Sequence, residues 1–111
     1  IEISPWLQRT ALRAAIRGVG AVPMAYSPLA RGHKIDDPGI SALADSLGCA
    51  PAQAAIKWCI DTGSITIPKS SNPSRIEENI LSLSIDLSGT EEAFAALEES
   101  YVSGWDPTSE P

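Results

Sequence analysis

The sequence IPKSSNPSRIEEN, from Ile67 to Asn79, is the most informative segment of this chain. Its pattern predicts a short strand that ends near Lys69 and passes at once into a helix. Asn72 is a residue type that caps helix N-termini, and Pro73 suits the first helical position, where no amide donor is needed. The stretch therefore predicts a strand and a helix joined by a short turn.

This turn also has the chemistry of an anion site. The first amide groups of a helix have no partners within the helix and carry the positive end of its dipole, so they attract anions. Lys69 enters the turn from the strand side, and Arg75 comes from the first helical turn. Either cation alone would be a solvated surface charge, but the two beside a helix N-terminus predict a bound phosphate group.

The composition limits the kind of partner that such a site serves. The chain has 111 residues and a formal net charge of −6. A nucleic-acid-binding protein needs a broad basic face, so this class is excluded, whereas a single phosphate depends on the charges nearest to it. No apolar run has the length of a membrane span and no signal peptide is recognisable, which favours a cytoplasmic protein that does not bind membranes.

Short apolar runs alternate with helical periods along the chain. Strands are predicted at residues 1–3, 21–25 and 65–67, with helices after each of them. This alternation predicts right-handed crossovers and a parallel sheet of an α/β fold, with two open edges. Pro23 fits poorly in a central strand because proline cannot donate to the ladder, unless the second strand begins later.

The helical periods have recognisable ends. A helix is predicted from Leu12 to Val19, another near residues 40–47, and a third that begins at Pro51. The helix after the phosphate turn should direct its apolar face inward, with Ile76, Ile80 and Leu83.

The C-terminal part contains one more helix signal. Residues 88–91 read as a capping box that opens a last helix. This helix should place three large side chains inward, namely Phe94, Leu97 and Tyr101. Residues 102–111, rich in Gly, Ser and Pro, are predicted to form an irregular tail.

The strand ends bring polar residues together. Parallel strands place their carboxyl ends at one edge of the sheet, where α/β folds carry their sites. In this chain that edge receives Ser4, Tyr26 with Ser27, and Lys69 with Ser70. We therefore expect the phosphate turn to have a tyrosine as its neighbour.

Three stretches carry a family resemblance. Residues 67–79 resemble the cofactor-phosphate motif of the aldo-keto reductases, which are NADP(H)-dependent oxidoreductases built on a TIM barrel. Residues 25–32, AYSPLARG, are similar to the family segment after the seventh strand, and residues 1–8, IEISPWLQ, to the end of the sixth strand. The resemblance implies a partial (β/α)8 TIM barrel, about the last three βα units with a C-terminal helix and tail.

The length bears on this assignment. A complete (β/α)8 barrel needs about 250 residues, so 111 residues cannot form all of it. Residues 1–111 are therefore expected to be the C-terminal portion of one barrel domain, as a fragment or a partial gene product. A natural stand-alone half-barrel is the alternative. An isolated portion is expected to self-associate through its exposed sheet edges.

The resemblance implies that residues 69–79 hold the adenosine end of NADP(H). Lys69, Ser70 and Arg75 match the residues that bind the 2′-phosphate, and a guanidinium at Arg75 is also suited to lie against the adenine face. The remaining contacts, which complete the cradle or hydrogen-bond the adenine edge, are implied for Ser71, Asn72, Glu78 and Asn79.

The loop after the second strand is implied to hold the rest of the cofactor. Tyr26 matches the aromatic residue that stacks on the nicotinamide ring, and the alternative is an ordinary half-buried strand tyrosine. Ser27 and Leu29 match positions that contact the pyrophosphate. Arg31 is a further candidate in the same loop.

Five other residues have side chains of types that occur in binding sites. His33 does not match the catalytic histidine of the family and is expected to be a surface residue. Cys49 and Cys59 lack the spacing of a metal or redox motif and are expected to be reduced thiols. Trp6 and Trp105 are candidates for lining a substrate pocket.

The resemblance also implies what this chain lacks. The family reaction requires an aspartate, a tyrosine acting as general acid, a lysine and a histidine, and no residue here matches these four. The chain is expected to supply the cofactor-binding part of an enzyme that reduces small aldehydes and ketones to alcohols, without a metal, and to be inactive alone. The alternative is a truncated, non-catalytic paralogue that acts as an interaction or assembly module.

Overall fold

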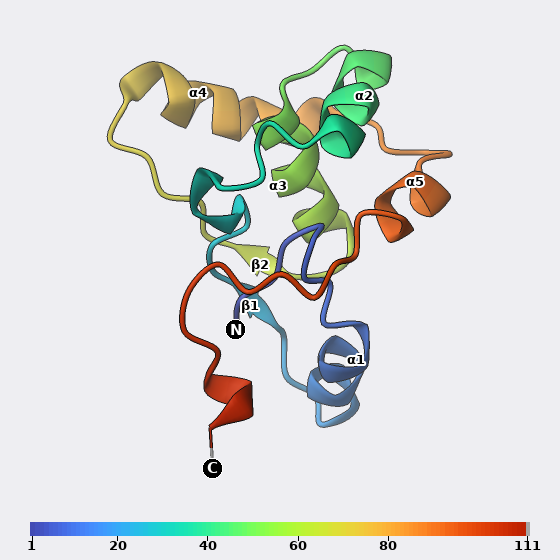
Figure 1. Ribbon diagram of the computed structural model, residues 1–111, viewed down its shortest axis with the longest axis vertical. Helices are drawn as coiled ribbons and strands as arrows, with labels where there is room; N and C mark the ends of the chain where they lie inside the picture. Colours follow the sequence, from blue (N-terminus) through green and yellow to red (C-terminus); the bar gives the residue numbers. More distant parts are fainter. Residues whose placement is uncertain (111) are drawn as a thin grey trace.

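The computed structural model describes residues 1–110 and builds the chain around a small parallel sheet (Figure 1). Strand β1, Met24–Ala25, pairs in parallel with β2, Ile65–Thr66. On the other side of β1, Glu2 forms a parallel bridge with Tyr26. The order of the extended segments is therefore 1–3, β1, β2, as expected for consecutive βα units. The first segment contributes a single bridge here, which is less than the strand predicted at 1–3.

Pro23 precedes the sheet and does not interrupt it. The strand predicted at 21–25 begins only at Met24, so the prediction was wrong in its start. The carbonyl of Pro23 accepts a hydrogen bond from the amide of Ile65 at 2.9 Å. Proline can make this contact because it needs no N–H, so the residue is accommodated at the start of the pairing.

Five α-helices lie within residues 1–110: α1 Thr10–Gly18, α2 Pro38–Leu47, α3 Pro51–Asp61, α4 Pro73–Leu81 and α5 Glu91–Ala95. Asp37 caps α2 by accepting hydrogen bonds from two backbone amides, and Gly48 ends it with a φ of 66°. Proline opens each of α2, α3 and α4, where it removes no helical hydrogen bond. Figure 1 shows α2, α3 and α4 on one side of the sheet and α1 on the other.

The core lies where the sheet meets α2, α3 and α5. Ile3, Ile40, Cys59 and Phe94 are buried there, and the ring of Trp58 stacks on that of Phe94 with 6.1 Å between centroids. Burial of these large apolar surfaces is the main stabilising term of the fold.

Trp6 belongs to this core as well. Its side chain is 0% exposed and packs within the same cluster. The prediction that Trp6 lines a substrate pocket was wrong, because the indole points inward from its loop.

The last helix is shorter than predicted. The residues expected to form a capping box bond elsewhere: the Thr90 hydroxyl donates to the carbonyl of Leu87 and the Ser88 hydroxyl to Asp86. Helix α5 spans only Glu91–Ala95, although Phe94 is buried as expected. Tyr101 lies beyond the helix, so its place on a helical face was wrong.

Helix α4 exposes the apolar face that was expected to be buried. Ile76 is 48% exposed, Ile80 65% and Leu83, just beyond the helix, 61%. These three side chains line a cavity of about 410 Å³ together with Ile56 and Ile60 of α3, so the face points toward the body of the protein but stays open to solvent. With β2, which has β1 as its one hydrogen-bonded neighbour in the sheet, it forms an open apolar side of the molecule.

The chain after α5 turns back across the sheet side of the molecule (Figure 1). The amides of Glu99 and Tyr101 both donate to the carbonyl of Trp6, at 3.1 and 3.0 Å. The amide of Ser103 donates to the buried carboxylate of Glu2 at 2.9 Å. These bonds hold the segment although it has no regular secondary structure before the 3-10 turn at Pro107–Ser109.

Among residues 1–110, none of the helices combines the length and the apolar character that a bilayer crossing requires.

Candidate cofactor site

The candidate site lies at the carboxyl ends of the two paired strands. Tyr26 and Ser27 directly follow β1, and Lys69 and Ser70 come shortly after β2. Because β1 and β2 are parallel, both turns leave the sheet at the same end. The topology therefore brings together two of the stretches that were predicted to form one site.

The N-terminus of α4 is organised by the residue predicted to cap it. The Asn72 side-chain oxygen accepts hydrogen bonds from the amides of Ser74 at 3.0 Å and Arg75 at 3.4 Å. The Ser70 hydroxyl in turn accepts from the amide of Asn72 at 3.1 Å. The prediction that the first amide groups of this helix are free was therefore wrong for two of them, because Asn72 already accepts their hydrogen bonds. An anion here would depend mainly on side chains, with the helix dipole as support.

Two adjoining cavities open beside this helix end. One has a volume of about 320 Å³ and the other about 460 Å³. Four residues line both of them, which makes the pair one continuous cleft: Leu29, Gly32, Lys69 and Arg75. The first cavity also has Ser70, Glu78 and Asn79 in its wall, and the second has Ser27 and Arg31.

The cleft thus unites most of the residues that the sequence indicated. Of the predicted cofactor contacts, Tyr26, Ser71 and Asn72 are not in the walls of these two cavities. Tyr26 is half-buried, and its amide donates to the carbonyl of Ile1 at 3.1 Å. Ser71 is exposed in the turn before α4. These three residues therefore lie next to the cleft along the chain without lining it.

The cations of the cleft are available to a ligand. Within residues 1–110 the ion pairs join Arg9 to Asp106, Lys34 to Glu99 and Lys57 to Asp61. Lys69 and Arg75 take part in none of these pairs, and both side chains are exposed. The cleft has three cations, Arg31, Lys69 and Arg75, and one carboxylate, Glu78, in its walls. This excess of positive charge creates a local potential that favours an anionic group, despite the negative charge of the whole chain.

The loop after β1, residues 27–32, also lines the cleft and has an unusual backbone. Ser27, Ala30 and Arg31 have positive φ angles of 47°, 47° and 56°, and Gly32 follows at 82°. For residues with a Cβ atom this conformation costs of order 1–3 kcal/mol each, and it persists only where the surroundings hold it. Tight turns fix it locally, because the amide of Ala30 donates to Ser27 and that of Gly32 to Leu29.

Some wall residues were missed by the sequence analysis. Ile35 and the start of α3, residues 50–52, complete the cavity of about 320 Å³. The Ala50-Pro51 helix start was a usable signal, because a helix that precedes a parallel strand begins at the carboxyl end of the sheet. Ile35 had no signal of this kind in the loop.

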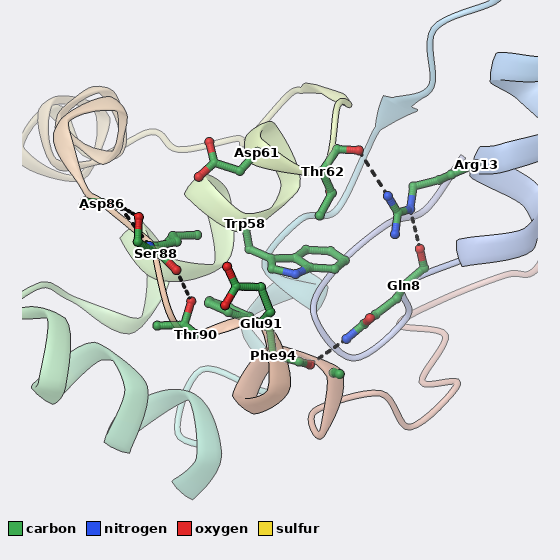
Figure 2. A pocket seen from close by; sticks show the side chains of 12 residues that line it. Gln8, Arg13, Trp58, Asp61, Thr62, Asp86, Ser88, Thr90, Glu91 and Phe94 are labelled. Carbon is green, nitrogen blue, oxygen red and sulfur yellow. Dashed lines mark hydrogen bonds between the residues drawn. The ribbon is translucent and has the colours of Figure 1, made fainter.

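A third cavity, of about 420 Å³, was also not predicted (Figure 2). Figure 2 shows the Trp58 indole at its centre, with Arg13 on one side and Glu91 on the other. The Arg13 guanidinium lies 5.5 Å from the indole centroid and donates to the carbonyls of Gln8 at 2.7 Å and Thr62 at 3.1 Å. Burial, with a smaller effect of the neighbouring Arg17, lowers the pKa of Arg13.

This third cavity is unsuited to a phosphate. Three carboxylates share its wall with the single guanidinium, namely Asp61, Asp86 and Glu91. Hydrogen bonds from the Ser88 hydroxyl and then its amide hold the pKa of Asp86 below its ordinary value. The cavity is therefore acidic, and Arg13 is largely satisfied by backbone oxygens.

The remaining candidates have ordinary surroundings. Cys49 and Cys59 are free thiols, and burial raises the pKa of Cys59 to about 12, which keeps it protonated and unreactive. His33 is an exposed loop residue, as expected, with its Nδ1 atom 3.0 Å from the Tyr101 hydroxyl. Trp105 is 69% exposed, and its indole donates to Glu110 at 3.2 Å.

Comparison with known proteins places this geometry in a family. The sequence profile described as the Aldo/keto reductase family matches residues 36–102. An aldo-keto reductase of Mycolicibacterium smegmatis is 40% identical over 108 residues, which cover 96% of this chain and 39% of the relative. An aldo/keto reductase of Synechocystis is 35% identical over 94% of this chain and 36% of its own length.

Solved structures agree with this assignment. A mutant of Gox0644 in complex with NADPH superposes with a TM-score of 0.89 at 30% identity, over 100% of this chain and 42% of that protein. An aldo/keto reductase from Brucella melitensis gives a TM-score of 0.81 at 35% identity, over 88% of this chain and 38% of the other. These superpositions confirm the predicted fold class of a partial barrel, and the chain spans well under half the length of these relatives. From its sequence profile and its three-dimensional likeness, the chain belongs to the aldo/keto reductase family.

Proposed function

We propose that the complete protein is an NADP(H)-dependent oxidoreductase that reduces small aldehydes and ketones to alcohols, and that this chain supplies its cofactor-binding part. One observation carries the proposal: Lys69 and Arg75 line the same cleft and have no carboxylate partner within residues 1–110. When bound, the cofactor supplies the hydride for the reduction of the carbonyl carbon.

The adenosine end of the cofactor suits the smaller cavity of the cleft. Lys69, Arg75 and the Ser70 hydroxyl supply donors for the 2′-phosphate, and charge-assisted hydrogen bonds are the strong kind. Glu78 and Asn79 offer acceptors and donors for the adenine edge. We assign Ser71 to the same phosphate as an exposed hydroxyl, and Asn72 acts as the cap that orients the turn.

The pyrophosphate and nicotinamide fit the wall formed by the loop after β1. Ser27 and Leu29 line the larger cavity, and Arg31 adds a third positive charge near the pyrophosphate. We assign the ring of Tyr26, next in the chain to Ser27, to stacking on the nicotinamide. We place the four catalytic residues in the rest of the protein, so this chain alone should not reduce carbonyl compounds.

The decisive experiment compares NADPH with NADH. In the full-length protein, Lys69→Ala combined with Arg75→Ala should weaken NADPH binding by a few kcal/mol, because each charge-assisted bond contributes roughly 1.5–3 kcal/mol. NADH binding should barely change. Titration calorimetry or quenching of protein fluorescence measures both affinities.

A matched control removes two positive charges elsewhere. Lys57 pairs with Asp61, and Arg17 donates to the carbonyl of Thr62, both away from the cleft. The variant Lys57→Ala with Arg17→Ala should leave the ratio of NADPH to NADH affinity unchanged. Equal losses of NADPH and NADH in the cleft variant would remove the 2′-phosphate assignment.

The alternative function, a non-catalytic interaction module, has one observation in its favour. The exposed apolar residues of α4 and the open edge of β2 offer a surface for another chain. Light scattering of residues 1–111 with and without NADPH separates the two functions. A monodisperse dimer whose size does not change with NADPH supports the interaction module. Aggregation or a molten state supports the cofactor-binding part of an enzyme.

A further inference from the structure

We propose that the segment Glu99–Gly104, here called the tail clasp, positions the loop 27–37 and thereby sets how long the nicotinamide nucleotide stays bound. The inference rests on the proposed function, because it concerns the same cleft. It adds a role for residues outside the cavity walls, namely Glu99 and Tyr101.

The tail clasp contacts the loop directly through two side chains. The Lys34 ammonium lies 2.8 Å from the Glu99 carboxylate and 5.2 Å from the centroid of the Tyr101 ring. His33 Nδ1 lies 3.0 Å from the Tyr101 hydroxyl, and the two rings meet edge to face. Two consecutive loop residues are therefore bound by two residues of the tail. The hydrogen bond with Glu99 raises the pKa of Lys34, as expected for a cation held by a carboxylate.

A third contact involves Arg31, a loop residue that lines the cleft. A Cβ atom added at Gly104 would come within 3.1 Å of the Arg31 guanidinium, so this side chain lies close against the tail backbone. Arg31 also lines the cavity of about 460 Å³. The tail clasp thus reaches a wall residue of the cleft.

The tail clasp is itself fixed to the body of the protein. Two backbone amides, those of Glu99 and Tyr101, donate to the carbonyl of the fully buried Trp6, and Ser103 donates to the buried Glu2. Tyr101 also packs against the core. Ser100, between Glu99 and Tyr101, has a positive φ of 56°. This tight turn of the backbone lets the amides of both neighbours point to the same carbonyl. The clasp is therefore a fixed support for the loop.

The loop needs such a support because of its backbone. Three of its non-glycine residues, Ser27, Ala30 and Arg31, are in the left-handed region. Strained conformations persist only where the surrounding structure holds them, and an unsupported loop would relax toward lower-energy conformations. Leu29 and Gly32 line both cavities, so relaxation would alter the cleft that receives the nucleotide. A loop held in the binding conformation saves the ordering cost on association.

The position of the loop determines whether the tail clasp affects the dissociation of NADPH, of NADH, or of both. Lys69 and Arg75 belong to the segment that follows β2, whereas the loop follows β1. Loosening the loop should therefore weaken NADPH and NADH by the same factor, mainly through faster dissociation. Changes at Lys69 and Arg75 should instead separate the two nucleotides. This difference makes the inference distinguishable from the proposed function.

The experiment measures dissociation of NADPH and NADH from the full-length protein by stopped-flow fluorescence. The variant Glu99→Gln with Tyr101→Phe removes the ion pair and the hydroxyl but keeps the ring. We expect both dissociation rates to rise by roughly three- to tenfold, given the typical strength of an exposed ion pair and a hydrogen bond. Glu92→Gln is the matched control, because Glu92 is exposed on α5 and forms no ion pair within residues 1–110.

A charge exchange tests the positioning role apart from stability. Lys34→Glu alone should speed dissociation, and Lys34→Glu with Glu99→Lys should restore the slow rates of the unmodified protein. Unchanged rates in the Glu99→Gln, Tyr101→Phe variant, with NADPH still preferred over NADH, would overturn the inference and leave the proposed function intact. An effect confined to NADPH would also overturn it. If the unmodified protein binds neither nucleotide, both the inference and the proposed function fail.

Discussion

Arg13 and Arg75 have identical side chains but opposite surroundings. Arg13 is 7% exposed, lies over an indole and donates to two backbone carbonyls. Arg75 is exposed in the cleft and has no ion-pair partner within residues 1–110. An arginine that is free to bind a ligand is therefore marked by unsatisfied hydrogen-bonding capacity and not by its charge alone.

The largest expected effect that tests this comparison is on stability. Arg13→Ala in the full-length protein should lower the free energy of unfolding by about 3 kcal/mol, because it leaves two carbonyls without donors and removes the contact with Trp58. Denaturant unfolding followed by circular dichroism measures the change. Arg75→Ala is the control, and its effect should stay within about 0.5 kcal/mol because the side chain is exposed. Similar losses for the two variants would contradict the comparison.

A smaller effect is expected at Asn72, which lies beside the cleft along the chain and is assigned as a helix cap and not as a ligand contact. Asn72→Ala should cost about 1 kcal/mol of stability, since the side chain caps α4 through two amide hydrogen bonds. Asn72→Asp should retain the cap and serve as the control for stability. If Asn72→Ala weakened NADPH as strongly as the loss of Lys69, then Asn72 would be a direct ligand contact and our assignment of it as a cap would be wrong.

The smallest effect is expected at Asp86, in the acidic cavity. Its pKa is lowered in the folded protein, chiefly by the Ser88 hydroxyl, so its stabilising contribution is present above the unfolded pKa and is lost as the pH falls through the folded value. Asp86→Asn should therefore reduce stability slightly at neutral pH and leave it unchanged in strong acid. Thermal melts from pH 2 to 7 check this, with the exposed Asp45→Asn as a reference. The expectation would be contradicted if the melting temperatures of Asp86→Asn and the unmodified protein differed more in acid than at neutral pH.

Local signals accounted for much of the fold and the candidate site. Asn72 and Pro73 begin α4 as predicted, and Gly48 and Pro51 separate α2 from α3. These positions act through backbone geometry within one turn, which a sequence shows directly. The gathering of Lys69 with the loop after β1 followed from the parallel order of the strands.

The features that were missed depend on distant parts of the chain. The hydrogen bond between Ser103 and Glu2 joins residues 101 positions apart, and no local sequence pattern predicts it. The exposed side of α4 has the period of a buried helix face, but periodicity does not show what covers it. Helix α5 lacks the predicted capping box because Thr90 and Ser88 bond within their own turn, an alternative that short polar side chains always offer.

The left-handed backbone at Ser27, Ala30 and Arg31 has a consequence for engineering. Glycine at these positions would relieve the steric cost of each angle, so selection for heat resistance in the laboratory should favour it there. The same replacement would soften this wall of the cleft and, on the proposed function, weaken the binding of the nucleotide. In a directed-evolution experiment, thermal stability and nucleotide binding should therefore be hardest to improve together in this short loop.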